Sequence, residues 1–199
     1  MSTRAKPRRF YGVRWFVGCP QSGKSTLARE LASRLHRERR VPVIVLDAQS
    51  VHNFAELPEC KLEDVAATVW KHPRASVRVV PRDVDEVDRI CRAVSAGGDV
   101  VLLVDEAHNW LSAQSGCSGE LVRLMRTVQH ARADLFLTTQ HLTGDVHQGA
   151  LSCTSELYVF RNTSPRVLQV LERDFGMDRA KIQALPQFKC FRKLLGFQG

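Results

Sequence analysis

The chain alternates between short apolar runs and segments in which apolar residues recur every three or four positions. Runs such as "VRWFV" and "VPVIVLD" are typical of buried strands, because almost no polar residue interrupts them. Segments such as "LARELASRL" place leucines and alanines on one face of a helix. We expect strands over residues 13–17, 41–47, 76–80, 99–110, 133–141, 155–162 and 187–196, and helices over 23–39, 62–70, 83–98, 120–132, 164–176 and 178–186.

This alternation predicts the fold class. Strands that alternate with helices form an α/β domain, in which helices flank a central, mostly parallel sheet. The last run, 187–196, is expected to be an edge strand, and 112–119 a polar loop. The 199 residues are enough for one well-buried domain. We therefore expect a basic, flexible arm over residues 1–12 and a single domain over residues 13–199.

The charge is unevenly distributed along the chain. The net charge is +8, with +9 in residues 1–40, −6 in residues 41–160 and +5 in residues 161–199. Two basic ends favour a polyanion as partner, because clustered Lys and Arg displace counterions from phosphates. Arg8, Arg9 and "HRERR" at 36–40 are the densest basic stretches. The second is equally well explained as an ordinary helix end, where basic residues are favoured by the helix dipole.

Two classes of protein are disfavoured by composition. No apolar run approaches the ~18 residues of a membrane span, and the basic start lacks the apolar core of a secretory signal. We therefore expect no transmembrane segment and a cytosolic location, or one inside a particle assembled in a cytosol. No two cysteines have C-x-x-C spacing, so free thiols are expected; the cysteines are Cys19, Cys60, Cys91, Cys117, Cys153 and Cys190.

The stretch "GCPQSGKST" has the spacing of a loop that wraps phosphates. It follows a predicted strand and leads into a predicted helix, so its backbone amides and the helix start converge on one anion. Lys24 is expected to reach the outer phosphates of a nucleoside triphosphate, and Ser25 to ligate Mg²⁺. Cys19 is better explained as a small residue filling the loop than as a redox centre. The predicted phosphate-binding residues are Gly18, Cys19, Pro20, Gln21, Ser22, Gly23, Lys24, Ser25 and Thr26.

A second group of candidate residues follows two later strands. Asp105 ends the apolar run "VVLLV" and is placed to ligate the metal, with Glu106 directly after it as the base for an attacking water. Gln140 ends the run "ADLFLTT" and either senses the γ-phosphate or is an ordinary loop residue. His141 and His147 are close enough in sequence to suggest a metal site, but a loop pair without a third ligand is more often solvated.

These motifs together resemble a known family. "GCPQSGKS", "VVLLVDEAH", "RADLFLTTQH" and "ELYVFRNTSPRVLQVLERDFG" are similar in kind and order to the additional-strand, catalytic-glutamate P-loop ATPases. Within these, the chain resembles the FtsK–HerA superfamily of DNA-pumping motors, over about residues 13–195. Because almost the whole chain would be motor core, it is similar to the genome-packaging ATPases of membrane-containing icosahedral viruses. Where those motors often read Q-R-P, this chain has "QHL".

The resemblance implies an ATP-hydrolysing motor that translocates double-stranded DNA and packages a viral genome into a preformed capsid. It implies ATP and Mg²⁺ as cofactors, a homo-oligomeric ring, often a hexamer, and a location in the host cytoplasm or the virion. Capsid-vertex or viral membrane proteins are possible docking partners. An arginine finger from the neighbouring subunit is also implied, with Arg132 as first candidate and Arg161 and Arg166 as alternatives.

Three other functions stay open at this stage. An ATPase that drives protein assembly or secretion has the same motifs. A small nucleotide kinase needs an acceptor pocket and an Arg-rich lid, which the acid pair and Gln140 fit less well. In a non-hydrolysing switch, removal of the Glu106 carboxylate would leave turnover unchanged.

Overall fold

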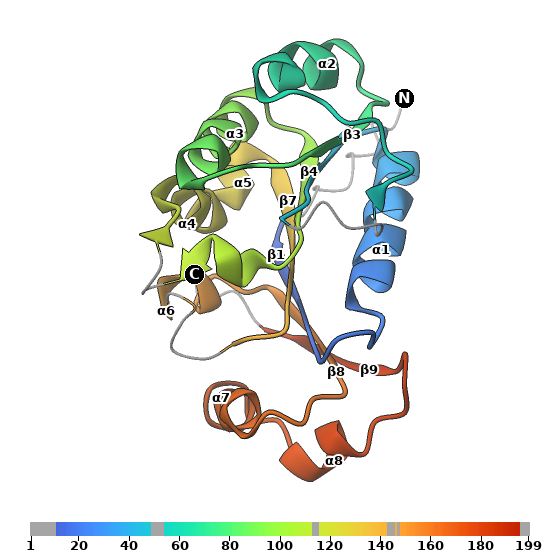
Figure 1. The fold of residues 1–199 in the computed structure, drawn as a ribbon, viewed down its shortest axis with the longest axis vertical. Coiled ribbons are helices and arrows are strands. Elements are labelled where there is room, and N and C mark those ends of the chain that lie inside the picture. Colours follow the sequence, from blue (N-terminus) through green and yellow to red (C-terminus); the bar gives the residue numbers. More distant parts are fainter. Residues whose placement is uncertain (1–10, 49–53, 113–115, 143–145, 147, 196–199) are drawn as a thin grey trace, which may run out of the picture.

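The computed structural model describes residues 11–48, 54–112, 116–142, 146 and 148–195. Most of the predicted arm, including Arg8 and Arg9, lies outside the described residues, and so does His147. Figure 1 shows a twisted sheet running through the molecule with helices on both of its faces.

The central sheet has the strand order β3-β2-β4-β7-β1-β8-β9. Neighbouring strands are parallel throughout, except that β9 runs antiparallel to β8 at one edge. The predicted mostly parallel sheet and edge strand are therefore confirmed. The bounds are β1 Val13–Val17, β2 Val43–Leu46, β3 Ser76–Val79, β4 Val100–Val104, β7 Ala133–Thr139, β8 Glu156–Phe160 and β9 Cys190–Leu194.

Strand β7 lies between β4 and β1. It thus separates the strand that precedes the phosphate loop from the strand that precedes the acid pair, as the additional-strand class of P-loop ATPases implies. The carboxyl ends of β1, β4 and β7 meet at one edge of the sheet, since Val17 aligns with Thr139 and Val104 with Leu137. The predicted functional residues that follow these strands are brought together by this register.

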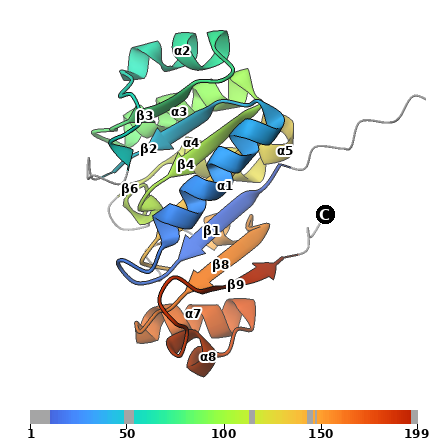
Figure 2. The same ribbon diagram turned by 90° about the vertical axis from the view of Figure 1, so that its right-hand side faces the viewer.

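The helices form two layers. Helix α1 (Lys24–Arg39) covers one face of the sheet, and α3 (Val84–Gly97), α4 (Gly119–Arg126) and α5 (Val128–Ala131) cover the other (Figure 1). Figure 2 shows α2 at the β3 end of the sheet and α7 and α8 at the β9 end. The remaining helices are α2 Val65–Lys71, which follows a 3₁₀ turn at Leu62–Asp64, α6 Gln148–Leu151, α7 Pro165–Phe175 and α8 Arg179–Gln183.

Local sequence explains where several helices begin and end. The side chains of Asp83 and Ser118 accept hydrogen bonds from the backbone amides of Glu86 and Leu121, which caps α3 and α4. Helix α7 has Pro165 in its first turn and ends at Gly176, whose φ of 58° is easy for glycine alone.

Both faces of the sheet are buried, as the uninterrupted apolar runs indicate. On β1, Phe16 faces α1 and packs with Ala28 and Phe136, whereas Trp15 lies in the larger core on the other face. Phe16 also stacks on Tyr158, with ring centroids 4.8 Å apart. Two cores on one sheet hold its central strands, and the described residues that directly follow these strands are positioned by them.

The chain departs from prediction after β4. The predicted strand 99–110 ends at Val104, and Glu106 adopts a left-handed conformation, with φ 45° and ψ 54°, before a 3₁₀ turn at Ala107–Asn109. The reason is tertiary: the Glu106 amide donates a hydrogen bond to the Thr138 hydroxyl on β7, at 3.1 Å. This bond turns the chain away from the strand direction, so the prediction for residues 106–110 is wrong.

The predicted helix 120–132 is broken at Thr127. Its φ of −117° ends α4, its hydroxyl donates a hydrogen bond back to the Arg123 carbonyl at 2.9 Å, and α5 starts after it. The predicted polar loop 112–119 contains part of a short antiparallel pair, β5 (Leu111–Ser112) with β6 (Gly116–Cys117). Helix α6 was not predicted.

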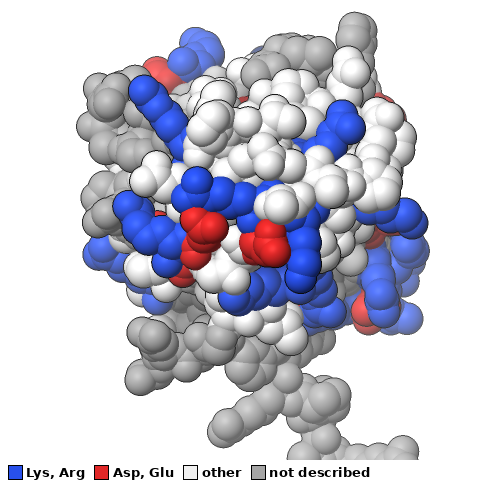
Figure 3. All heavy atoms as spheres, turned by 90° about the horizontal axis from the view of Figure 1, so that it is seen from below, with Lys and Arg blue, Asp and Glu red and all other residues white. Residues whose placement is uncertain are grey.

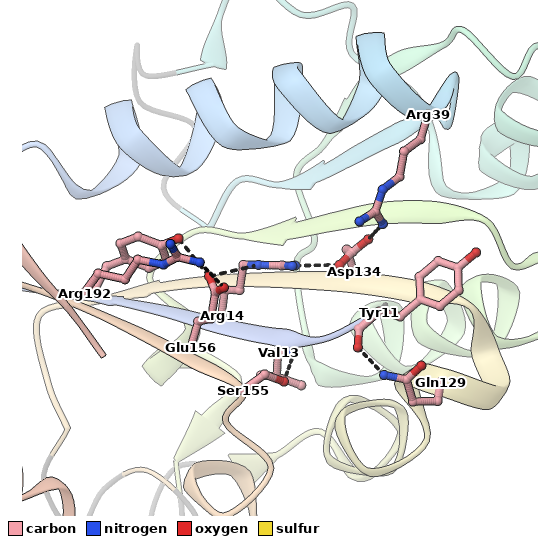
Figure 4. A network of polar contacts seen from close by, with 10 residues as sticks. Tyr11, Val13, Arg14, Arg39, Gln129, Asp134, Ser155, Glu156 and Arg192 are labelled. Atoms are coloured by element: carbon pink, nitrogen blue, oxygen red, sulfur yellow. Dashed lines mark hydrogen bonds and ion pairs between the residues drawn. The ribbon is translucent and has the colours of Figure 1, made fainter. Parts of the chain in front are cut away.

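A network of arginines and carboxylates crosses the middle of the sheet (Figure 4). Asp134 on β7 accepts from Arg14 on β1 at 2.5 Å and from Arg39 of α1 at 2.7 Å. Glu156 on β8 lies 3.3 Å from Arg14 and 2.6 Å from Arg192 of β9. We call Arg39, Asp134, Arg14, Glu156 and Arg192 the arginine–carboxylate network; it links four strands and the end of α1.

Candidate nucleotide-binding and hydrolysis site

The phosphate loop connects β1 to α1 and is attached to two neighbouring strands. The Gly18 amide donates to the Thr139 carbonyl at 3.3 Å, and the Cys19 amide donates to the Arg161 carbonyl at 3.1 Å. A Cβ at position 18 would lie 2.6 Å from the Cβ of Phe160, so only glycine fits there. Gly23 has φ +100°, which also favours glycine. These constraints explain the glycine spacing of the motif.

Lys24 begins α1 with its side chain turned back over the loop. Its ammonium donates a hydrogen bond to the Cys19 carbonyl at 3.1 Å, and the residue is 5% exposed. Burial lowers the pKa of Lys24, against the opposing effect of Glu106 and Asp105. A buried ammonium aimed at the loop is suited to bind anionic phosphate oxygens.

Asp105 lies opposite Ser25 across the carboxyl edge of the sheet. One carboxylate oxygen of Asp105, Oδ1, accepts from the Ser25 hydroxyl at 3.0 Å and from the Thr138 hydroxyl at 2.6 Å. Burial raises the pKa of Asp105, and the adjacent Glu106 and Asp47 raise it further, while both hydroxyls oppose this. Both hydrogen-bond partners of the carboxylate are therefore neutral, and Asp105 forms no ion pair among the described residues. Hydroxyl and carboxylate oxygens at this spacing fit Mg²⁺, which prefers oxygen ligands.

Glu106 is held between two side chains at the tip of β7. Gln140 donates a hydrogen bond to its Oε1 at 2.8 Å, and His108 Nδ1 lies 3.3 Å from its Oε2. Burial alone raises the pKa of Glu106. The contacts with His108 and Gln140, together with the Lys24 charge, outweigh burial and hold this pKa below its usual value. The carboxylate is therefore ionised at neutral pH, in the protonation state that a general base needs.

The Oε2 atom of Glu106 is buried and has no aligned hydrogen-bond donor among the described residues. The Ser22 hydroxyl in the phosphate loop is also buried without a partner there. Buried polar atoms without partners are uncommon in folded proteins and mark places where a ligand or water belongs. Both atoms lie in the predicted site, one in the loop and one on the predicted base.

Three further residues complete the site and were not predicted as part of it. Thr138 bridges Asp105 and the Glu106 amide, His108 contacts Glu106, and Asp47 ends β2 beside Asp105. Thr138 and Asp47 could have been predicted as site residues, because each lies at the end of a predicted strand. His108 had no signal, because it belongs to the turn that the sequence did not predict.

The other predicted residues lie in different places. Pro20, Gln21 and Thr26 are exposed on the phosphate loop and the first turn of α1. Arg132 lies at the opposite edge of the sheet, since it precedes β7 and forms an ion pair with Asp99. Arg161 directly follows β8 and is exposed at the same edge as the phosphate loop. Within one chain, Arg132 is therefore not brought to the site.

Two kinds of feature are absent from the part of the chain that the structure describes. No group of three His, Cys, Asp or Glu side chains is arranged to hold a metal. The ring of His141 lies instead 4.8 Å from that of His108, edge to face. No helix there has both the length and the apolar surface to cross a membrane.

Comparisons with known proteins agree with this geometry. A sequence model described as an AAA domain matches residues 12–144. The genome-packaging NTPase B204 from Sulfolobus turreted icosahedral virus 2, in complex with sulfate, has a similar structure, with a TM-score of 0.77 and 19% identity over 95% of this chain and 93% of B204. Its complex with ATPγS gives a TM-score of 0.76. No curated protein sequence matches the chain significantly.

Two larger proteins share the fold. The pCW3 conjugation coupling protein TcpA has a TM-score of 0.65 and 12% identity over 92% of this chain and 57% of TcpA. EccC from Thermomonospora curvata, in complex with a signal sequence peptide, has a TM-score of 0.52 and 14% identity over 77% of this chain and 30% of EccC. These likenesses confirm the predicted P-loop NTPase fold.

Proposed function

Because this chain belongs to the AAA-domain family and has the site of a P-loop ATPase, we propose that it is a motor that uses ATP to move double-stranded DNA. Its task would be to package a viral genome into a preformed capsid. The observation that carries the proposal is the near full-length correspondence with a genome-packaging NTPase, over 95% of this chain and 93% of the other. The location that follows is the host cytoplasm or the virion.

The residues of the site divide the chemistry between them. The loop amides and Lys24 bind the β- and γ-phosphates of ATP. Ser25 and Asp105 hold Mg²⁺, which when bound neutralises the charge that develops on the transferred phosphoryl group. Glu106 accepts a proton at Oε2 from the attacking water, and Gln140 fixes the other carboxylate oxygen.

The end of the molecule that carries α7, α8 and β9 supports contact with a polyanion. Figure 3 shows that Lys and Arg outnumber Asp and Glu at this end. Exposed basic residues of the segment 161–199 include Arg161, Arg166, Arg179, Lys181 and Lys189. Arg179 and Lys181 are paired with carboxylates, whereas the other three have no ion pair within the described residues. An unpaired basic excess favours binding to DNA phosphates.

A ring, with a hexamer favoured, is part of the proposal. A P-loop domain hydrolyses slowly until a positive charge reaches the transition state, and a finger donated by a neighbour adds ~10³–10⁵ in rate. Arg132 remains the first predicted finger, with Arg161 and Arg166 as alternatives. Arg132 lies away from the site of its own chain and pairs with Asp99, so as a finger it would act on the site of a neighbouring subunit. Docking to capsid-vertex or viral membrane proteins is proposed from the similarity to the genome-packaging NTPase.

The test is phosphate release with and without double-stranded DNA, measured on the wild type and on Glu106→Gln. We expect DNA to stimulate hydrolysis by the wild type. We expect Glu106→Gln to abolish this stimulated hydrolysis. Binding of double-stranded DNA should weaken as salt is raised. Hydrolysis that ignores DNA, together with no binding at low salt, would overturn the proposal.

A second candidate function is an ATPase that drives protein assembly or secretion. The similarity in fold to EccC, determined with a signal sequence peptide, favours it. In that case peptides rather than DNA would stimulate phosphate release. The same assay therefore separates the two functions.

A further inference from the structure

A tight turn between α8 and β9 lies against the phosphate loop. The Lys189 amide donates to the Pro186 carbonyl at 3.2 Å, which closes the turn. A Cβ built on Gly23 would lie 3.1 Å from Phe188 Cδ1 and 3.7 Å from Phe188 Cα. In Figure 2 the connection from α8 to β9 runs beside the connection from β1 to α1. This turn is therefore in direct contact with the motif that binds phosphate.

Phe188 stands where the turn favours glycine. It is the third residue of the turn and has φ +64°, a left-handed conformation that is strained for a bulky side chain. Its side chain is nevertheless 67% exposed, so the ring gains little from burial. Local strain without a packing gain points to a functional reason for the residue.

We propose that Phe188 is the platform on which the base of the bound nucleotide stacks. The inference rests on the proposed function, since it assumes that the loop holds a nucleoside triphosphate. The Phe188 ring touches the phosphate loop with one edge, through Gly23, and presents the rest to solvent. A nucleotide with its phosphates on the loop extends its ribose and base outward from there. An exposed aromatic ring is the side chain best suited to stack on a purine or pyrimidine face.

A docking surface for another protein is the competing explanation. The exposed large apolar side chains of the described residues are Phe188, Phe191 and Leu194, all near or on β9. Phe188 differs from the other two because it lies on the turn that contacts the phosphate loop. Phe191 is therefore a matched control, as an exposed phenylalanine on the same edge that lies on the strand itself.

The test is calorimetric titration of the full chain with ATP and, separately, with inorganic tripolyphosphate, which has no base. We expect Phe188→Ala to weaken ATP binding by roughly five- to a hundredfold, the range of base–aromatic stacking, and to leave tripolyphosphate binding unchanged. Phe188→Trp should restore ATP affinity. Phe191→Ala should leave both affinities unchanged.

Phe188→Gly distinguishes the contribution of the ring to ATP binding from the effect of the strained backbone on stability. Glycine adopts φ +64° without strain, so this variant should unfold at a higher temperature and yet bind ATP as weakly as Phe188→Ala. Equal ATP affinity in Phe188→Gly and wild type would overturn the proposal that Phe188 stacks on the base. Loss of self-association with unchanged ATP affinity would do so too, in favour of a docking surface. If the wild type bound neither ATP nor tripolyphosphate, the proposed function itself would fail, which is a different result from loss of ATP binding alone.

Discussion

Two clusters of charge share strand β7 and differ in how their carboxylates are neutralised. In the arginine–carboxylate network, Asp134 and Glu156 each contact two arginine side chains. In the site, Asp105 is held by two neutral hydroxyls, and one oxygen of Glu106 has no aligned donor among the described residues. Asp134 lies near the start of β7, whereas Thr138, which donates to Asp105, lies near its end.

This difference distinguishes carboxylates that stabilise the fold from carboxylates that act in the site. A carboxylate with two arginines has its charge balanced by the protein itself, and it links neighbouring strands. A carboxylate whose hydrogen-bond partners are neutral hydroxyls keeps a charge that a bound cation can balance; burial, more than the neighbouring acids, raises the pKa of Asp105. Removing a charge should therefore weaken the fold in one cluster and the activity in the other.

The largest effect is expected at Glu106. Glu106→Gln removes the base but keeps the shape of the side chain, so the rate of phosphate release should fall by ~10²–10⁴-fold. Stability should not fall, because the variant no longer buries a carboxylate oxygen without a donor. Phosphate release and thermal unfolding of the same preparation check both parts. If the variant lost stability as well as activity, Glu106 would be a residue that stabilises the fold, which contradicts this prediction.

Asp134→Asn should give the opposite pattern. The Asp134 carboxylate is 2% exposed and has two arginine partners, so the substitution takes one buried carboxylate away from both Arg14 and Arg39. We expect unfolding in urea to show a loss of about 3 kcal/mol, typical of a broken buried pair. The KM for ATP should stay within twofold of wild type at a temperature where the variant is folded. Arg34→Ala, which removes an exposed i,i+4 pair with Glu38, is the matched control.

His108 gives a smaller test of the same distinction. Its Nδ1 lies 3.3 Å from both Glu106 Oε2 and Thr139 Oγ1, so it positions the base without being one. His108→Ala should lower kcat about tenfold, because Glu106 loses a contact that orients its carboxylate, and should leave the KM for ATP unchanged. His108→Asn, which keeps a polar group there, should recover part of the rate. A raised KM with unchanged kcat would contradict this role.

The smallest effect concerns the pH dependence of stability at Glu156. Burial raises the pKa of Glu156, but Arg192, Tyr158 and Arg14 outweigh it and lower this pKa below the usual 4.5. A lowered folded-state pKa adds stability above the unfolded-state value, and that stability is lost as the pH falls through the folded-state pKa. Unfolding free energies should therefore fall less steeply below pH 4.5 in Glu156→Gln than in wild type. Identical slopes would show that Glu156 adds nothing to acid sensitivity.

The regular part of the fold was predictable because each strand and helix is dictated by its own residues. The apolar run 100–104 is buried on both faces, and the leucines and alanines of α1 follow the helical period. The turn at Glu106 was not predictable in this way. It depends on the Thr138 hydroxyl, which is 32 residues away in sequence and reaches Glu106 only after β4 and β7 have paired.

The site was predictable where a motif carries its own spacing. Lys24, Ser25, Asp105 and Glu106 lie together as the motifs indicate, and Gln140 contacts Glu106 directly. His108 was missed because nothing in its neighbourhood along the chain marks it. Phe188 was missed for a similar reason, since an aromatic residue in a turn gains meaning only from the loop beside it.

The strand order also bears on how the protein is made. β1 is the first described strand to leave the ribosome, yet its two neighbours in the sheet are β7 and β8, which begin at Ala133 and Glu156. Until those residues have been synthesised, the loop after β1 lacks the Thr139 and Arg161 carbonyls to which it is attached. The nascent chain thus cannot complete its nucleotide site until Arg161 has been translated, and the apolar strand β1 does not have both of its neighbours in the sheet until then.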